Sequence, residues 1–208
     1  VGGALNEGLV SGESVIDCST SGCWRGGRKY RLPGDHHPLG KINVREVVSK
    51  SSNRGAAQLG ILLGDQRLYE YCRAFGFGTR TGIGFQGERK GVVHPPKRWD
   101  GLTITRLPMG HAVSVTPMQM HVAMAAVAND GIIMKPQLAR RVFDSEGKTV
   151  LDFKPRSTHR VLRSDVAKLL TDMLVGVVAD GTARTARIDG YEVAGKTGTT
   201  KKIIDGQY

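Results

Sequence analysis

Apolar residues in the first third of the chain recur at the spacing of amphipathic helices. They predict a short helix over residues 42–50 and a second helix that ends at Gly64. A third helix is predicted to begin at Asp65 and to end at Gly76. The expected buried positions are Ala56, Ala57, Leu59, Leu62 and Leu63 in the second helix, and Leu68, Tyr71, Cys72 and Phe75 in the third.

The helical pattern stops after Gly76 and returns only at Thr116. Residues 76–108 are rich in glycine, proline and charge without a sustained period, which is long for a loop and suggests an excursion on the substrate side. Thr116 followed by Pro117 predicts the capped start of another helix, and Gly131 predicts its end. The residues expected to face inward are Met120, Met124 and Val127.

Strand patterns and a further helix follow in the last third. Residues 141–143 and 149–153 flank a polar loop, which predicts a β-hairpin. The next helix is predicted to be capped by Ser164 or Asp165 and to end at Gly181. Its expected inward residues are Val166, Leu169, Leu170, Met173 and Val177. This order predicts an α+β fold, of the multi-domain α and β type, with helices collected on one side of a sheet.

Composition limits the functional classes. With 208 residues, 39% of them hydrophobic, the chain is expected to be one globular domain or part of one. The net charge of +11 would suit an anionic partner, but the basic residues are scattered and only 6% of residues are aromatic, so we expect no nucleic acid partner. No apolar run reaches the length of about 20 residues that a membrane helix needs, so any anchor is expected outside these residues.

The three cysteines do not form a disulfide framework. A bridge between Cys18 and Cys23 is possible in an oxidising compartment, whereas Cys72 lies in a helical pattern. The cysteine pair with His36 and His37 fits no standard zinc spacing. We therefore expect no metal, and nothing in the sequence indicates a cofactor.

A run of small and polar residues interrupts a pattern that begins as a strand at Tyr191. The run consists of Gly195, Lys196, Thr197, Gly198 and Thr199. Glycine inside a strand marks a place where another chain or a ligand comes close to the backbone. We therefore expect a binding edge here, with Gly195 as a packing or bulge position.

A second polar group, Ser51, Ser52 and Asn53, stands at the junction of the first two predicted helices. Alone, it would be an ordinary N-cap. A Ser-x-Asn triplet followed by a Lys-Thr-Gly strand, however, is part of the residue set of serine acyltransferases such as penicillin-binding proteins. Acyl transfer needs a base near a serine hydroxyl and donors aimed at the oxyanion, which hydroxyl, amide and ammonium groups can supply.

On these motifs the chain resembles the transpeptidase domain of class B penicillin-binding proteins, which cross-link the bacterial cell wall. Further family signatures follow in family order over nearly the whole chain: HPLGKINVREVVSKSSNRGAAQLG, TGIGFQGERKG, VTPMQM, AAVANDGIIMKPQ and VVADGTARTA. The resemblance implies a helical lobe beside a mainly antiparallel sheet. It also implies a serine-type D,D-transpeptidase that binds penicillin covalently.

The resemblance assigns catalytic roles to Ser51, Asn53 and Lys196. Ser51 would pass protons between a catalytic lysine and the leaving amine, and Asn53 would hold that lysine and a substrate carbonyl. Lys196 would place positive charge near Ser51 and the substrate carboxylate. Ser52 is expected to be a spacer.

The same resemblance assigns substrate binding to Thr197, Gly198 and Thr199. The two threonine hydroxyls would bind the carboxylate, and the backbone N–H of Thr199 would be an oxyanion donor. Gly198 would leave room for a stem peptide or a β-lactam to lie alongside as an added strand.

The family's nucleophile belongs to a Ser-x-x-Lys element that precedes the triplet, on a helix whose tail resembles ALNEGLV at residues 4–10. No such element occurs at that place, since the serines there lack a lysine three residues on: Ser11, Ser14, Ser19 and Ser21. We therefore expect residues 1–208 to be a partial transpeptidase domain that lacks the nucleophile and the closing strands and helix, and that is inactive by itself.

The implied partners are peptidoglycan stem peptides, β-lactam antibiotics, and membrane proteins of division or elongation. The implied location is the extracytoplasmic (periplasmic) face of the bacterial inner membrane, with an anchoring helix outside this chain. Two alternatives remain open: a β-lactam-hydrolysing or β-lactam-sensing relative of the same fold, and a non-catalytic scaffold. The long excursion over residues 76–108 favours the transpeptidase type.

Overall fold

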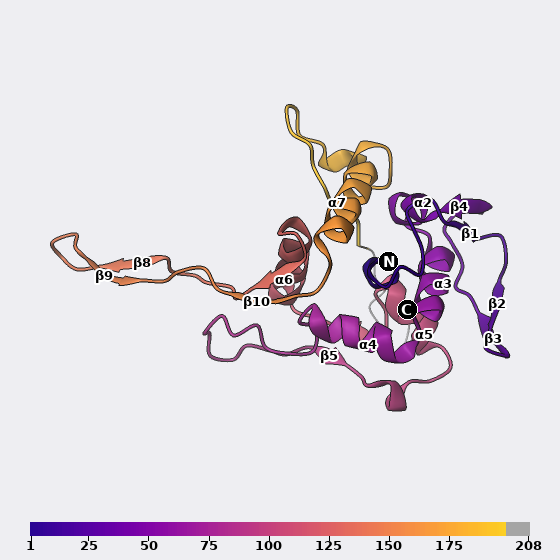
Figure 1. The fold of residues 1–208 in the computed structure, drawn as a ribbon, viewed down its shortest axis with the longest axis horizontal. Helices are drawn as coiled ribbons and strands as arrows, with labels where there is room; N and C mark the ends of the chain where they lie inside the picture. Colours follow the sequence, from indigo (N-terminus) through magenta and orange to yellow (C-terminus); the bar gives the residue numbers. More distant parts are fainter. Residues whose placement is uncertain (199–208) are drawn as a thin grey trace, which may run out of the picture.

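The computed structural model describes residues 1–198 (Figure 1). Its helices are α1 (Gly2–Asn6), α2 (Val44–Ser49), α3 (Asn53–Leu63), α4 (Asp65–Ala74), α5 (Thr103–Arg106), α6 (Pro117–Ala128) and α7 (Ser164–Ala179), with the 3-10 turns η1 (Pro96–Arg98), η2 (Leu107–Met109) and η3 (Arg184–Ala186). The strands form antiparallel pairs: β1 (Val15–Asp17) with β4 (Lys41–Asn43), β2 (Gly22–Arg25) with β3 (Arg28–Arg31), β5 (Val92–Val93) with β6 (Val113–Ser114), β7 (Ile132–Met134) with β10 (Ser157–Arg160), and β8 (Arg141–Phe143) with β9 (Thr149–Asp152).

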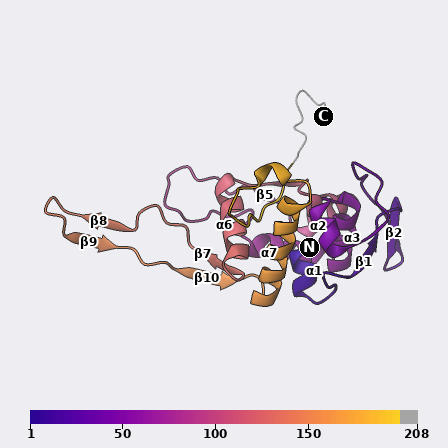
Figure 2. The same ribbon diagram turned by 90° about the horizontal axis from the view of Figure 1, so that it is seen from above.

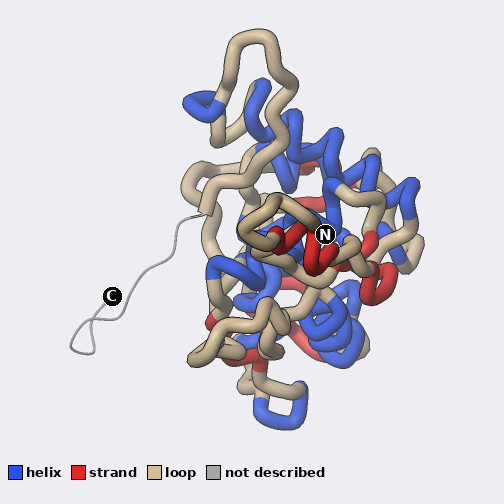
Figure 3. The backbone as a smooth tube through the Cα atoms, turned by 90° about the vertical axis from the view of Figure 1, so that its left-hand side faces the viewer, coloured by secondary structure: helices blue, strands red, loops and turns tan. Residues whose placement is uncertain are grey.

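Helices form most of the body, and the β8–β9 hairpin projects from one end of it (Figures 1 and 2). The strands occur as short two-stranded ribbons among the more extensive helices (Figure 3), apart from the projecting β8–β9 hairpin, which agrees with the predicted α+β class. Within residues 1–198 these ribbons stay separate and do not join into the single sheet that was expected. The strand predicted to begin at Tyr191 is also not formed over residues 191–198, because no described strand lies beside it to complete a hydrogen-bond ladder.

The main core lies where α2 packs against α7, with α1, α6 and the β7–β10 pair around them. Burial removes a continuous set of branched side chains from water, which stabilises the pairing of segments far apart in sequence. The fully buried members from α2 and α7 include Val44, Val47, Val166, Ala167, Met173 and Val177. This pairing brings the end of α2 close to the segment that follows α7.

Two helices begin differently from the prediction. Helix α2 begins at Val44 and not at Ile42, because Ile42 pairs with Ile16 in the β1–β4 ribbon and Asn43 caps the helix in a capping box with Glu46. Helix α7 begins at Ser164, so neither predicted cap residue is its N-cap. Arg163 occupies that position, without a side-chain capping bond.

Helix α6 keeps its predicted start, but its buried face differs from the prediction. Met120 and Met124 were expected in the core and are 45% and 38% exposed. The buried face is formed by Gln119, Val122, Ala123, Ala126 and Val127, at helical spacing. The helix is apolar on nearly every side, so periodicity could not distinguish the two faces.

The remaining elements agree closely with the sequence. Helix α3 ends just before Gly64 and α4 begins at Asp65, as predicted, while α4 ends at Ala74, two residues before the predicted Gly76. Helix α4 has no fully buried residue, and its expected inward residues are only half-buried: Leu68, Tyr71, Cys72 and Phe75. The predicted hairpin is present as β8 and β9, with every strand residue exposed. The excursion over residues 76–108 contains β5, η1, α5 and the start of η2. No helix among residues 1–198 is long and apolar enough to cross a membrane.

Gln119 connects this excursion to α6. It is 1% exposed. The two protons of its side-chain amide are shared among the carbonyl oxygens of Thr79 at 2.5 Å, Lys90 at 2.9 Å and Gly76 at 3.3 Å, while its Oε1 accepts from the Thr116 backbone N–H at 2.9 Å. One side chain therefore forms hydrogen bonds to four backbone groups of three segments.

Replacing Gln119 by leucine should lower the free energy of unfolding by about 3 kcal/mol, since several backbone groups lose their partner in a buried place. Urea denaturation followed by circular dichroism measures this change. The matched control is Met120→Leu on the exposed side of the same helix, for which we expect a change below about 0.5 kcal/mol. Equal stability of Gln119→Leu and the control would contradict this role.

Candidate active site

The predicted triplet forms the tight turn between α2 and α3. The Ser51 and Ser52 backbone N–H groups donate to the Val48 and Val47 carbonyl oxygens, at 3.2 and 3.0 Å, which ends α2. Ser51 has φ of 56°, in the left-handed region, which costs about 1–2 kcal/mol for a residue with a side chain. Hydrogen bonds of the neighbouring Ser52 hold the turn in this conformation.

Ser52 is more than the spacer that the sequence suggested. It is 2% exposed and is the N-cap of α3, where its Oγ accepts from the Gly55 N–H at 3.0 Å. The same hydroxyl lies 3.0 Å from Asp35 Oδ2 and 3.4 Å from Cys18 Sγ. The triplet is thus fixed by its middle residue, and Ser51 on one side is left to face the site.

Asp35 is a residue that the sequence reasoning did not place at the site. Its Oδ1 accepts from the backbone N–H groups of Asn53 at 2.5 Å and Arg54 at 3.1 Å, while Oδ2 accepts from the Ser52 hydroxyl. A carboxylate at the start of a helix is stabilised by the helix dipole and by the unpaired N–H groups. No local sequence signal predicts this pairing, because Asp35 lies 18 residues before Asn53.

The loop beneath the triplet is held by Arg54 and contains Cys18. The Arg54 guanidinium donates to the carbonyl oxygens of Cys18 and Ser19 at 3.0 Å and of Pro33 at 3.2 Å. All three cysteines are free thiols, so Cys18 and Cys23 are not bridged. Burial raises the pKa of the Cys18 thiol, which keeps it neutral under the triplet.

Lys196 reaches Ser51 from the other end of the chain. Its Nζ lies 2.8 Å from Ser51 Oγ, 3.1 Å from the Thr197 carbonyl oxygen and 3.3 Å from Thr197 Oγ1. Much of the residue is exposed, but partial burial of its ammonium group lowers the pKa of Lys196 from the usual value. An ammonium has three protons to donate and no acceptor site, so Ser51 must accept in this contact and its own proton stays available.

Backbone hydrogen bonds to α7 and α2 hold the segment that leads from α7 to Lys196. The Gly195 N–H donates to the Leu174 carbonyl oxygen at 3.1 Å, and Thr182 N–H donates to the Ser49 carbonyl oxygen at 3.3 Å. A side chain at Gly181 would collide with that same Ser49 oxygen, so only glycine allows this close approach. The signature VVADGTARTA therefore brings the end of α7 against the end of α2.

Of the other predicted site residues, Asn53 and Gly198 make no hydrogen bond with Ser51 or Lys196 within residues 1–198. The Asn53 side-chain amide donates to the Gly34 carbonyl oxygen at 2.9 Å. Gly198 is exposed. Thr199 lies outside the described residues.

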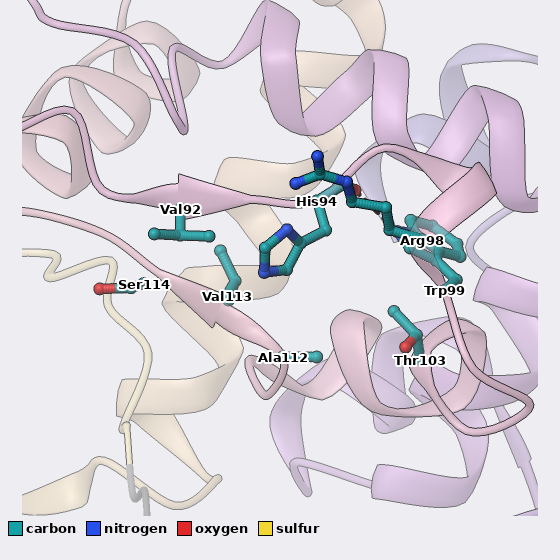
Figure 4. A pocket seen from close by; sticks show the side chains of 8 residues that line it. All are labelled: Val92, His94, Arg98, Trp99, Thr103, Ala112, Val113 and Ser114. Carbon is teal, nitrogen blue, oxygen red and sulfur yellow. Dashed lines mark hydrogen bonds between the residues drawn. The ribbon is translucent and has the colours of Figure 1, made fainter.

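A separate hollow of about 270 Å³ lies beside the β5–β6 ribbon. Figure 4 shows its lining, with Val92 and Val113 from the ribbon and His94, Arg98 and Trp99 from the segment that follows β5. None of the predicted site residues lines it. It is therefore distinct from the Ser51–Lys196 contact.

The Ser-x-x-Lys spacing occurs at Ser145 and Lys148, but not in a helix. Both residues are exposed in the loop between β8 and β9. The hairpin lies at the opposite end of the molecule from α2 in both views (Figures 1 and 2). This pair therefore cannot supply a nucleophile next to Ser51.

A Ser-x-Asn turn in contact with a Lys-Thr-Gly segment, on an α+β body, is the arrangement of the penicillin-recognising serine acyltransferases. The family model described as the penicillin binding protein transpeptidase domain matches residues 1–208. The chain belongs to this family, as its sequence signatures predicted.

Relatives and solved structures agree with this assignment. The chain is 37% identical over 198 residues to stage V sporulation protein D of Bacillus subtilis, covering 95% of this chain and 29% of that protein. It is 37% identical over 209 residues to penicillin-binding protein PbpB of Mycobacterium tuberculosis, covering 97% and 30%. The crystal structure of penicillin binding protein 3 from M. tuberculosis in complex with aztreonam matches with a TM-score of 0.84 and 33% identity, over 99% of this chain and 47% of that one. The chain thus spans less than a third of the length of these curated relatives.

Removing the Asp35 carboxylate should loosen the triplet. We expect Asp35→Ala to lower the free energy of unfolding by about 2 kcal/mol, because two N–H groups at the start of α3 lose their acceptor. Urea denaturation measures the change. Asp189→Ala is the matched control, since the exposed Asp189 makes no side-chain hydrogen bond within residues 1–198. A loss below about 0.5 kcal/mol for Asp35→Ala would show that water replaces the carboxylate without cost.

Proposed function

We propose that this chain is part of a longer peptidoglycan D,D-transpeptidase that transfers the acyl group of a D-Ala-D-Ala stem peptide to an amine of a second stem peptide. The observation that carries the proposal is the 2.8 Å contact between Lys196 Nζ and Ser51 Oγ, two groups from motifs 145 residues apart. The family assignment and the names of relatives such as peptidoglycan D,D-transpeptidase FtsI of Escherichia coli, 28% identical over 211 residues, support it.

The proposed reaction begins with a serine and a lysine that the rest of the protein supplies, outside residues 1–208. The serine oxygen bonds to the carbonyl carbon of the penultimate D-alanine, and its proton passes to that lysine. The amide C–N bond then breaks, and the terminal D-alanine leaves as an amine. An amine of a second stem peptide attacks the resulting ester, forms the new amide and releases the serine.

Ser51 is the proposed proton carrier to the leaving nitrogen. Because Lys196 donates to its oxygen, Ser51 keeps its own proton for donation. Lys196 also supplies fixed positive charge for the substrate carboxylate, and the Thr197 hydroxyl beside it is a second donor. Asn53 is proposed to turn toward the lysine of the nucleophile element and the substrate carbonyl. Gly198 and Thr199 are proposed to line the peptide-binding edge.

The same reaction suggests where the intact protein works. Its substrate is the cell wall, so we propose an anchored protein on the extracytoplasmic face of the bacterial inner membrane. Membrane proteins of division or elongation are its proposed partners. β-Lactams are proposed to acylate the same serine, because they present a strained amide and a carboxylate in the positions of the stem peptide.

Lys196→Ala in the intact protein should lower the second-order rate constant of acylation by fluorescent penicillin by about two orders of magnitude, the size expected for a group that stabilises developing charge. Labelling is followed by in-gel fluorescence over time. Lys168→Ala, at an exposed position on α7, is the control and should label at the normal rate. Unchanged labelling of Lys196→Ala would remove Lys196 from the site.

The acylation rate should also fall at alkaline pH, with a midpoint below the usual lysine pKa of 10.5, because partial burial lowers the pKa of Lys196. Between the lowered pKa and 10.5 the unfolded chain binds the proton more tightly, so this group alone makes folding more favourable as pH rises. The loss of rate would therefore not reflect unfolding at this site. Lys196→Arg retains its charge and should move the fall to higher pH. A pH profile identical in both proteins would contradict this assignment.

A further inference from the structure

Thr182 contacts the candidate site without belonging to either motif. Its Oγ1 lies 2.9 Å from Thr197 Oγ1, and either hydroxyl can be the donor. Its backbone N–H donates to the Ser49 carbonyl oxygen at 3.3 Å, and the neighbouring Gly181 packs directly on that oxygen. The Thr182 hydroxyl is therefore held by a backbone that is itself fixed to the end of α2.

We propose that Thr182 is a positioning residue that directs the proton of the Thr197 hydroxyl toward a carboxylate-bearing ligand. The inference rests on the proposed function and deepens it, because it names the part of the ligand that Thr182 serves. Thr182 acts through Thr197 and does not itself touch the reacting atoms.

The Thr197 hydroxyl can take part in only three hydrogen bonds. Thr197 Oγ1 has one proton to donate and two lone pairs that accept. The Lys196 ammonium, 3.3 Å away, is a donor only and takes one lone pair. When Thr182 donates as well, both lone pairs are occupied, and the Thr197 proton is left for a third group.

A bound carboxylate requires that Thr182 be the donor in its hydrogen bond with Thr197. An ionised carboxylate only accepts hydrogen bonds, so a ligand carboxylate at Thr197 must receive the Thr197 proton. Thr197 then cannot donate to Thr182, and the contact between the two hydroxyls persists only with Thr182 as the donor. Hydrogen bonds to a charged group are about twice as strong as neutral ones, so orienting this proton matters most for an anionic ligand.

An uncharged ligand would gain much less from the same arrangement. An ester oxygen in place of the carboxylate is a weaker acceptor and has no charge for the oriented proton to meet. Loss of the Thr182 hydroxyl should therefore penalise ligands according to their carboxylate. The terminal D-alanine of a stem peptide and the carboxylate of a penicillin share this chemistry.

The test compares benzylpenicillin with its methyl ester on the intact protein. Acylation rate constants are measured by mass spectrometry of the whole protein, for the wild type and for Thr182→Val, Thr182→Ala and Thr182→Ser. For Thr182→Val and Thr182→Ala we expect a loss of about five- to tenfold with benzylpenicillin, the effect of one hydrogen bond, and less than about twofold with the ester. Thr182→Ser keeps the hydroxyl and should restore the rate with benzylpenicillin.

Thr185→Val is the matched control. Thr185 lies three residues further along the chain and makes no side-chain hydrogen bond within residues 1–198. It should react as the wild type does with both compounds. The melting temperatures of all variants show whether each one folds. If either Thr182→Val or Thr182→Ala fails to fold, the other variant still tests the loss of the hydroxyl.

Several outcomes would contradict the proposed role of Thr182. Equal losses with the acid and the ester, or no rescue by Thr182→Ser, would show that Thr182 only supports the loop, and the inference would be wrong. Unchanged rates in Thr182→Val and Thr182→Ala would also overturn it while leaving the proposed function intact. A wild-type protein that reacts with neither compound would overturn the proposed function itself.

Discussion

The site depends on a single contact between the Lys196 ammonium and the Ser51 hydroxyl. Each group comes from a turn or an irregular segment, and 145 residues separate them along the chain. Such a contact has no local cause, so the scaffold must hold both ends independently. The packing of α2 on α7 does this, because it fixes the position of the backbone that precedes Ser51 and of the backbone that leads to Lys196.

Two different kinds of support maintain the two ends. On the Ser51 side, polar groups act: the Ser52 hydroxyl and the Asp35 carboxylate satisfy the N–H groups that begin α3 and hold the turn in its left-handed conformation. On the Lys196 side, the backbone is held by the hydrogen bond from Gly195 to the Leu174 carbonyl oxygen and by the close contact of Gly181 with the end of α2. Ser51 and Lys196 are thus placed by neighbouring groups that lie outside their own contact.

The direction of each hydrogen bond gives the contact its chemical meaning. An ammonium can only donate, so Ser51 and Thr197 accept from Lys196 and keep their own protons for another acceptor. The same partial burial that strengthens these bonds also lowers the pKa of Lys196. The contact with Ser51 and Thr197 therefore stabilises the Lys196 charge, while its partial burial has a cost in desolvation.

The sequence by itself determined the helices α3 and α4, the β8–β9 hairpin and the family, because caps, turn residues and motifs act over a few neighbouring positions. It also singled out Ser51 and Lys196 as candidate site residues, whose side chains the structure brings into contact. It did not determine which side of α6 is buried, since Met120 and Val122 are equally apolar and only the neighbouring elements distinguish them. Asp35 and the approach of α7 to α2 likewise arise from tertiary packing, because hydrogen bonds and burial between distant segments leave no periodic trace in the chain.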